Sequence, residues 1–266
     1  MPSFWICADL RSDGVTVGTG RSGWFRQRLL SSTEAPLPPW VPGDSLSESA
    51  AAAPALADAV AAHAASSGGK AEGVLLALPD RWFKIGLVSP KEAAREKVRM
   101  GEYARWKLQV DWNLREEGIY HDWQAVRGPR GESPALLLVA VERAVVDVMT
   151  SVGEAVGAPV MMCVPRAVAA WNRAASSLRG RDPSAALLRD GDSFTFFGAD
   201  RGRLRYLRSR RSDTPRDREA EEGETHRHFR EILGREAAEL PLEEWGGGAA
   251  VLEGLLSHPL LSGAFA

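Results

Sequence analysis

Two stretches of the sequence share one pattern: an apolar strand, an acidic turn where glycine is expected, and a second apolar strand. The first spans residues 4–17 and the second spans residues 185–197. Arginine stands in both turns, as Arg11 and Arg189. In several nucleotide-binding folds, hairpins of this kind open each half of the chain and hold phosphate groups with backbone N–H groups. The repeated hairpin therefore predicts two related halves in which the phosphate-holding chemistry is altered.

Length and composition allow one large domain or two modest ones. Apolar residues make up 44% of the 266 residues, which is enough for a substantial core. The 33 basic and 35 acidic residues nearly balance, so no overall field draws the chain to nucleic acid or anionic lipid. Cys7 and Cys163 lie in apolar runs, as expected of reduced thiols in a cytosolic protein. We find no signal peptide and no apolar run near the ~18 residues of a membrane span.

The expected elements divide the first 180 positions into a β-rich part and an alternating part. A third strand at residues 24–30, a proline-rich segment and a helix at residues 54–66 complete the β-rich part. From residue 73 strands and helices alternate, which fits an inserted α/β unit. Its expected elements are strands at 74–80 and 82–88, a helix at 90–108, a strand at 135–141, a helix at 142–156 and a strand at 159–165. A helix at 166–178 then leads to the second hairpin.

The sequence changes character after residue 211. Arginines concentrated in residues 201–218 precede a cluster of acidic residues, and we expect a mobile or solvated connection there. A helix is expected at residues 224–239. Beyond it, glycines at residues 246–248 open a short apolar helix, where missing side chains let a ligand approach the backbone.

This order of elements resembles the actin-like ATPase superfamily. More narrowly, the chain is similar to the type IV pilus assembly protein PilM and to the cytoplasmic domain of the type II secretion protein GspL. The closest stretch is residues 74–173, which contains the runs LALPDRWFKIGLV, EYARWKLQ, PALLLVAVERAVVDVMTSVGEAVGAPV and PRAVAAWNRA. The resemblance implies an α/β, actin-like (RNase H-like) fold of two lobes. The implied parts are a first lobe (1–72), an inserted α/β subdomain (73–164), a returning helix (165–183) and a shortened second lobe (184–266).

Transfer of the family's ATP site onto this sequence leaves several residue types changed. The first phosphate hairpin of the family reads approximately D-I-G-S-S-S-x-K, and here Arg11 replaces the glycine and Thr16 replaces the lysine. The acid of the second hairpin falls on Arg189. These changes should weaken triphosphate and magnesium binding. We therefore expect a pseudo-ATPase with no catalytic residue, no cofactor and no metal. The vestigial nucleotide cleft would comprise Asp9, Arg11, Ser12, Arg189, Asp190, Gly191, Gly246 and Gly247.

The resemblance implies an assembly function. Proteins of the PilM type hold a short cytoplasmic N-terminal segment of a membrane partner resembling PilN, and connect a pilus or secretion apparatus to its motor ATPase. The expected location is the cytoplasm, peripheral to the inner membrane. In the family the groove lies between the first lobe and the inserted subdomain, and aromatic residues are enriched at such anchors. The candidates for lining it are Trp82, Phe83, Tyr103, Trp106 and Trp112.

Other interpretations remain open at this point. The chain could be an active ATP-binding protein or kinase in which Arg11 or Arg189 neutralises phosphate, with Asp9 and Asp190 as the available acids. It could be a nucleic-acid-binding adaptor that uses the arginines of residues 201–218, although alternating arginines also fit the exposed face of a strand.

The two turn acids also have a simpler interpretation. Asp9 and Asp190 could be ordinary turn residues in local ion pairs with the neighbouring arginines. A metal site is not expected, because His226 and His228 are two positions apart and do not share a helix face.

Overall fold

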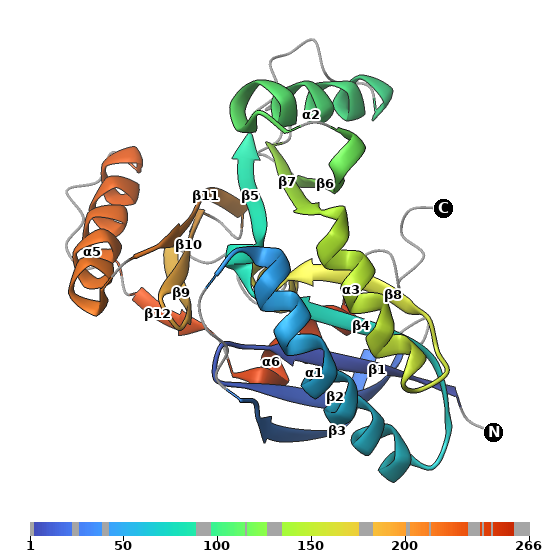
Figure 1. Cartoon of the computed structure of the whole chain (residues 1–266). Helices are drawn as coiled ribbons and strands as arrows, with labels where there is room; N and C mark the ends of the chain where they lie inside the picture. Colours follow the sequence, from blue (N-terminus) through green and yellow to red (C-terminus); the bar gives the residue numbers. More distant parts are fainter. Residues whose placement is uncertain are drawn as a thin grey trace. The chain divides into compact units, whose positions relative to one another are not determined.

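The computed structural model describes residues 3–22, 27–38, 43–88, 97–114, 116–126, 135–175, 183–200, 203–212, 214–233, 240, 242–245 and 247–257. The chain folds into two compact units, each assembled from more than one segment. Unit 1 comprises Met1–Trp82, Ala144–Ser176 and Trp245–Ala266, and unit 2 comprises Phe83–Arg143 and Ser177–Glu244. The colours of Figure 1 show elements from the beginning, middle and end of the sequence together in unit 1.

Unit 1 is built on a five-stranded sheet with the order β3-β2-β1-β4-β8. The first three strands form an antiparallel meander, and β4 and β8 extend the sheet parallel to β1. Residues 74–78 are fully buried, as expected of a central parallel strand that is covered on both faces. The strands are β1 (Ser3–Leu10), β2 (Gly14–Ser22), β3 (Gln27–Pro36), β4 (Lys70–Leu78) and β8 (Val160–Pro165).

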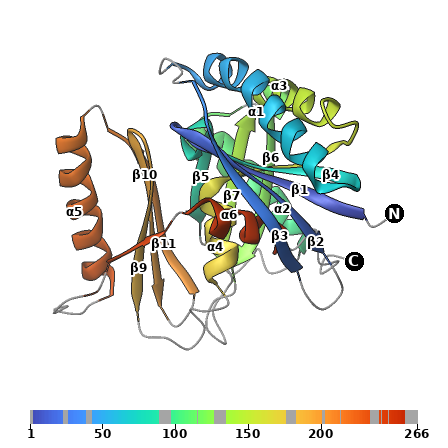
Figure 2. The same ribbon diagram turned by 90° about the horizontal axis from the view of Figure 1, so that it is seen from below.

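Helices cover both faces of this sheet. On one face lie α1 (Ser45–Ser67) and α3 (Arg143–Glu154), and on the other lie α4 (Arg166–Ala174) and α6 (Gly248–Leu256), as Figure 2 shows. α6 fits against β2 at two glycines. A Cβ added at Gly18 would lie 2.8 Å from a methyl carbon of Leu252, and one added at Gly20 would lie 2.3 Å from a methyl carbon of Leu256. The missing side chains of β2 therefore form a groove for two leucines of α6.

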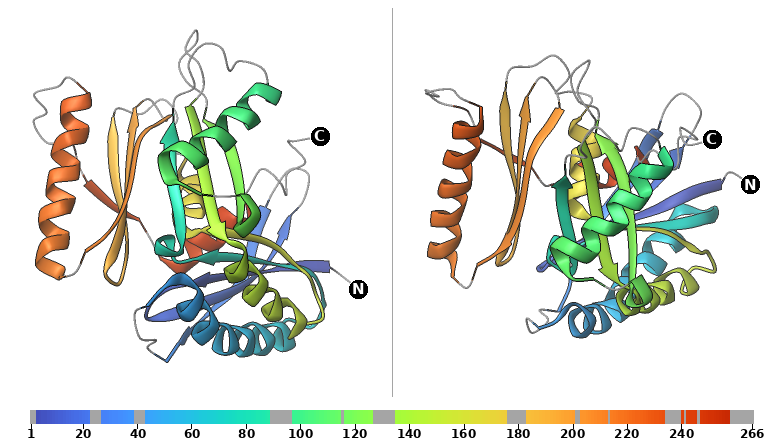
Figure 3. Two further views of the ribbon diagram at one scale, coloured as in Figure 1. Left: turned by 45° about the horizontal axis from the view of Figure 1, so that its top comes forward. Right: turned by 90° about the horizontal axis from the view of Figure 1, so that it is seen from above.

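Unit 2 contains two smaller sheets, each with a helix packed on it (Figure 3). The first has the order β5-β7-β6, and α2 packs on it through Ala104 and Leu108. The second has the order β11-β10-β9-β12, and α5 packs on it through Phe229. None of the helices in the described ranges is long and apolar enough to cross a membrane. The elements are β5 (Phe83–Val88), α2 (Lys97–Trp112), β6 (Ile119–Val126), β7 (Ala135–Glu142), β9 (Ser184–Asp190), β10 (Ser193–Asp200), β11 (Arg203–Arg211), α5 (Pro215–Ile232) and β12 (Leu242–Trp245).

The separate part inserted between segments of unit 1 is shorter than the sequence predicts. The expected insert spans residues 73–164, but β4 and β8, at its two ends, join the sheet of unit 1. The separate part runs from Phe83 to Arg143. Composition could not reveal this difference, because an apolar run reads the same whether its strand belongs to one sheet or another.

Two further differences lie toward the end of the sequence. The sequence predicts residues 184–266 as one shortened lobe, whereas α6 packs in unit 1 beside Cys7 and Leu75. A solvated connection is predicted after residue 211, whereas α5 begins at Pro215. Thr214 caps this helix by accepting the Asp217 N–H at 3.1 Å, and proline takes the first helical position. The expected helix at residues 224–239 is thus the second half of α5, and residues 234–239 lie outside the described ranges.

We expect Gly254→Ala to destabilise unit 1. A Cβ at Gly254 in α6 would lie 1.9 Å from the carbonyl oxygen of Ala169 in α4, and backbone cannot move aside as a flexible side chain can. Overpacking of this kind costs about 1–3 kcal/mol in free energy of unfolding. Thermal unfolding followed by circular dichroism should therefore show a lower midpoint.

The matched control is Gly223→Ala in α5. No heavy atom lies within 4 Å of its added Cβ, and alanine is the better helix former, so its midpoint should be unchanged or higher. An unchanged midpoint for Gly254→Ala would contradict the close packing of α4 on α6.

Candidate functional site

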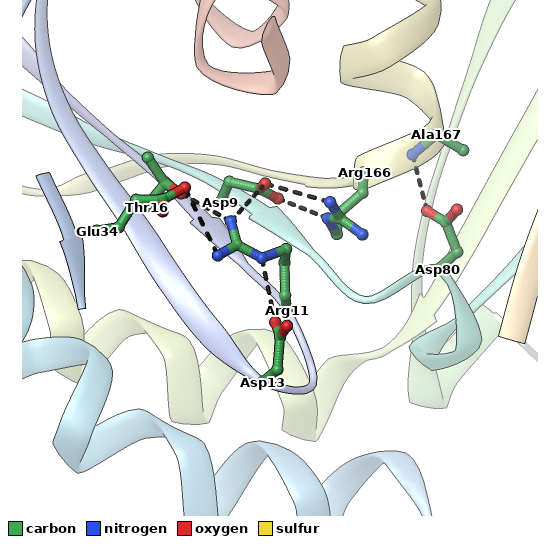
Figure 4. Close-up of polar contacts among 8 residues, drawn as sticks. All are labelled: Asp9, Arg11, Asp13, Thr16, Glu34, Asp80, Arg166 and Ala167. Carbon is green, nitrogen blue, oxygen red and sulfur yellow. Dashed lines mark hydrogen bonds and ion pairs between the residues drawn. The ribbon is translucent and has the colours of Figure 1, made fainter. Parts of the chain in front are cut away.

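The carboxyl ends of three parallel strands in unit 1 carry charged residues. Asp9 lies at the end of β1, Asp80 follows β4, and β8 runs directly into Arg166 at the start of α4. In open α/β sheets, ligands bind at this edge, beyond the carboxyl ends of the strands. Figure 4 shows the three side chains together, beside the turn of the first hairpin.

Asp9 and Arg166 form a buried ion pair with two hydrogen bonds. Arg166 Nε donates to Asp9 Oδ1 at 2.6 Å, and Arg166 Nη2 donates to Oδ2 at 3.3 Å. The side chains are 0% and 1% exposed. Two charges removed from water are tolerated only as a pair, and loss of one partner typically costs about 3–5 kcal/mol. The carboxylate of Asp9 in the first hairpin is therefore already neutralised by an arginine of the same chain.

The side chain of Arg11, in the turn of the first hairpin, is 19% exposed and contacts several residues of the hairpin. Its Nη1 donates to Thr16 Oγ1 at 2.7 Å and lies 3.7 Å from Asp9 Oδ2, while its Nε donates to Asp13 Oδ1 at 3.2 Å. The backbone N–H of Arg11 donates to the Gly14 carbonyl at 2.8 Å, which closes the turn. Ser12 lies half-buried within it. A guanidinium thus lies beside the backbone that would face phosphate in a nucleotide-binding hairpin of this kind.

Asp80 caps the helix that carries Arg166. Its Oδ1 accepts the backbone N–H of Ala167 at 2.8 Å, and its side chain is buried. A cation at the first position of a helix opposes the helix dipole, whereas a carboxylate there is favourable. Asp9 and Asp80 together therefore compensate for the unfavourable placement of Arg166.

Gly247 lies at the start of the short apolar helix, as the sequence predicts. Gly247 is the N-cap of α6, and Gly246 lies outside the described residues. The next residue, Gly248, packs on the first hairpin, where an added Cβ would lie 1.9 Å from Thr16 Oγ1. The start of α6 therefore packs directly on Thr16. This close packing, rather than the approach of a ligand, accounts for the missing side chain of Gly248.

The second hairpin repeats the ion-pair design with the charges exchanged. Arg189 of β9 donates to the two carboxylate oxygens of Glu222 in α5 at 2.9 and 2.7 Å, and its Nη1 lies 3.1 Å from Glu244 of β12. The hydrogen bond from Arg189 to Glu222 is the main cause that raises the arginine pKa above its usual range. Glu222 is buried, so the charged residue at the end of β9 is again held by an ion pair with a helix.

The turn of the second hairpin is held by further arginines. Gly191 has a φ of 58°, a left-handed conformation that glycine adopts without strain. Its carbonyl accepts a hydrogen bond from Arg218, and Arg211 Nε donates to Asp192 at 2.7 Å. Asp190 is buried, and because side chains alternate along a strand it points to the face opposite Arg189.

The arginine-rich stretch at residues 201–218 divides between a strand and a helix. β11 carries Arg205 exposed and Arg203 half-buried, while Arg201 lies outside the described residues. Arg211 and Arg218 hold the hairpin turn as described above. The expected alternation is seen only at the start of β11, where buried Leu204 lies between Arg203 and Arg205, because residues 206–209 are all half-buried.

The five aromatic candidates for partner binding have different surroundings. Trp82 is 4% exposed and donates from Nε1 to Glu48 at 2.6 Å. Phe83, at the start of β5, is also buried. The other three lie on α2: Trp112 packs against Gly86, Tyr103 is half-buried, and Trp106 is 50% exposed. Among the five, Trp106 keeps the most accessible ring.

Within the described residues, no group of three or more His, Cys, Asp or Glu side chains could hold a metal ion. Burial is the main cause that lowers the pKa of His226, and Arg230 lowers it further. Both cysteines are free thiols, and burial raises the pKa of Cys163 to about 12 and that of Cys7 higher still. These thiols are therefore protonated and poorly nucleophilic.

Sequence reasoning missed Arg166 and Glu222, which neutralise the two strand ends. For Arg166 a signal exists, because a cation directly after Pro165 at the start of an apolar helix opposes the dipole and implies a nearby carboxylate. For Glu222 no local signal exists, because it is one of several acids on α5 and only the packing selects it.

Comparison with known proteins shows the fold. No protein-family model and no curated protein sequence matches the chain. The structure of a PilM-PilN type IV pilus biogenesis complex has a TM-score of 0.63 at 14% identity, covering 97% of this chain and 85% of the other. A Bacteroides thetaiotaomicron protein with an actin-like ATPase fold gives 0.56 at 12% identity, covering 92% and 82%. The cytoplasmic domain of EpsL, an inner membrane component of the Vibrio cholerae type II secretion system, gives 0.52 at 15% identity, covering 99% and 100%. The expected actin-like fold is therefore confirmed.

We expect Arg166→Met to lower the free energy of unfolding by about 3–5 kcal/mol, because Asp9 is left buried without its partner. Arg173→Met in the same helix is the matched control. Arg173 pairs with Glu253, but the two side chains are 49% and 42% exposed, and such pairs contribute about 0–1 kcal/mol. Urea unfolding at neutral pH measures both changes. If both variants lower the free energy of unfolding equally, the buried pair does not contribute more to stability than the exposed pair, which contradicts this prediction.

Proposed function

We propose that this chain is a non-catalytic, actin-like adaptor of a pilus or secretion apparatus, with a vestigial nucleotide cleft. The observation that supports it most is the buried pair of Asp9 and Arg166. For Asp9 to bind a hydrated magnesium ion, it would first have to release Arg166. That step leaves a guanidinium buried without a partner, at a cost of several kcal/mol.

The first hairpin adds two further obstacles to nucleotide binding. Arg11 carries a side chain at a position where backbone N–H groups must approach phosphate closely, and that side chain is hydrogen-bonded to Thr16 and Asp13. Thr16 supplies no positive charge for the phosphates. The competing proposal of an active ATP-binding protein or kinase needs Asp9 as a magnesium-binding acid or a base, so the same ion pair counts against it.

The assembly function is supported by the kinds of protein that share the fold. One is a PilM-PilN type IV pilus biogenesis complex, and another is the cytoplasmic domain of an inner membrane component of a type II secretion system. We propose that this chain likewise holds a cytoplasmic N-terminal segment of a PilN-like membrane protein. It would then be cytoplasmic, peripheral to the inner membrane through that partner, and in contact with the motor ATPase of the same apparatus.

We expect no measurable binding of Mg-ATP and no ATP turnover. Isothermal titration calorimetry of the whole chain with Mg-ATP tests the first point, and phosphate release tests the second. The control is the double substitution Arg11→Gly with Thr16→Lys, which restores the family's residue types in the turn. It should remain inactive because Arg166 still holds Asp9. Binding of Mg-ATP by the unsubstituted chain with a micromolar dissociation constant would contradict the proposal that it is a pseudo-ATPase.

We expect the whole chain to bind a synthetic peptide of the cytoplasmic N-terminal segment of a PilN-like protein encoded nearby. Fluorescence anisotropy of the labelled peptide gives the affinity, and a scrambled peptide of equal charge is the control. The peptide must first be shown to bind the PilM-type protein that is its natural partner. If that peptide does not bind this chain, the adaptor function is rejected and only the shared fold remains.

A further inference from the structure

α2 carries apolar side chains on two opposite faces. Its inner face packs on the sheet of β5, β7 and β6 through the buried residues Ala104 and Leu108. Trp106 and Val110, one turn apart on the opposite face, are 50% and 59% exposed. A surface helix that packs one face usually carries polar residues on the other. The outer stripe of Trp106 and Val110 is therefore suited to contact with another chain.

The ring of Trp106 is already held in place by its neighbours on α2. The ring centroid of Tyr103 lies 5.7 Å from that of Trp106, and Lys107 Nζ lies 5.2 Å from the Trp106 centroid. Ordering a side chain on binding costs on the order of 0.5–1.5 kcal/mol, so an anchor that is already ordered loses less. Tryptophan is also enriched among the residues that dominate binding energy.

We propose that the outer face of α2 is a self-association surface, on which a second copy of this chain docks its own α2 in antiparallel orientation. The charges beside the stripe favour a second copy. Lys107 Nζ donates to Asp111 Oδ2 at 2.9 Å on one flank of α2. Glu102 and Arg105 add one more charge of each sign. Two identical faces therefore meet without net repulsion.

A two-fold axis at the level of Gln109 makes the two faces complementary. In an antiparallel pair, residues equally far before and after Gln109 then stand at the same height. Lys107 of each copy faces Asp111 of the other, as an interface with two-fold symmetry requires. Val110 of each copy falls between Trp106 and Val110 of the other, which buries the apolar stripe.

The contact is small and the association should be weak. One 16-residue helix against its copy lies below the standard interface size, in the range of transient contacts. We expect a dissociation constant on the order of 10–100 μM. This self-association goes beyond the proposed adaptor function and does not depend on it.

Sedimentation velocity of the whole chain, from about 1 to 500 μM, brackets the expected constant. The unsubstituted chain should shift from monomer to dimer across this range. Val110→Asp should raise the dissociation constant at least tenfold, because it places two buried carboxylates near each other. The matched control is Ile232→Asp on α5, which changes a side chain of similar exposure (51%) and should leave the constant unchanged. A chain that stays monomeric throughout overturns the proposal, as does equal weakening by both substitutions.

A charge exchange tests the register. Lys107→Asp alone or Asp111→Lys alone should each weaken the dimer several-fold, because like charges then face each other. The double exchange restores opposite charges and should recover most of the affinity. A double variant as weak as the single ones overturns the antiparallel arrangement. Circular dichroism midpoints of all variants confirm that α2 stays folded.

The peptide of the proposed membrane partner separates this surface from the adaptor function. Peptide binding that leaves the dimer intact, and that survives Val110→Asp, supports a second copy as the occupant of α2. Peptide that dissociates the dimer and no longer binds Val110→Asp would assign the α2 face to the membrane partner and overturn self-association.

Discussion

The contact between Asp9 and Arg166 is the constraint on which the first hairpin and its surroundings depend. It joins residues 157 positions apart and requires β1, β8 and α4 to be in place together. Neither charged side chain would be tolerated at this buried position without the other. Arg11 and Thr16 then complete a polar cluster in which each charged or hydroxyl group has a partner from the chain itself. The partners of these charged groups at the edge of the sheet where ligands usually bind are thus side chains of the chain itself.

The two hairpins reach the same electrostatic result with opposite polarity. In unit 1 the strand supplies the acid and the helix supplies the base, as Asp9 and Arg166. In unit 2 the strand supplies the base and the helix supplies the acid, as Arg189 and Glu222. A metal-bound polyphosphate needs acids for the metal and donors for the phosphates at the turns. With the charges exchanged, the strand of the second hairpin is still attached to its helix by an ion pair. The proposed loss of nucleotide binding predicts that this exchange disfavours a metal-bound polyphosphate.

Sequence reasoning reached the fold and the two hairpins because both have local signals. Alternation and glycine turns identified most strands and helices, and the order of elements identified the actin-like fold. It missed the start of α5, although Thr214, Pro215 and Asp217 together form a helix start. The partners of the strand-end charges were missed because Arg166 and Glu222 are selected by tertiary packing. Trp82 was a candidate for lining the partner-binding groove, and only the structure places its indole N–H against Glu48.

The position of α6 has a consequence for the order in which the chain can fold during synthesis. This helix fills the glycine groove of β2, yet it is separated from β2 by both segments of unit 2. One apolar face of the nascent sheet of unit 1 is therefore covered only in part, by α4, until residue 256 has left the ribosome. Late, long-range closure of this kind slows folding and exposes intermediates to aggregation. Unit 2, whose second sheet precedes α6 in synthesis, has no such dependence on that helix, so chaperone demand should fall mainly on unit 1.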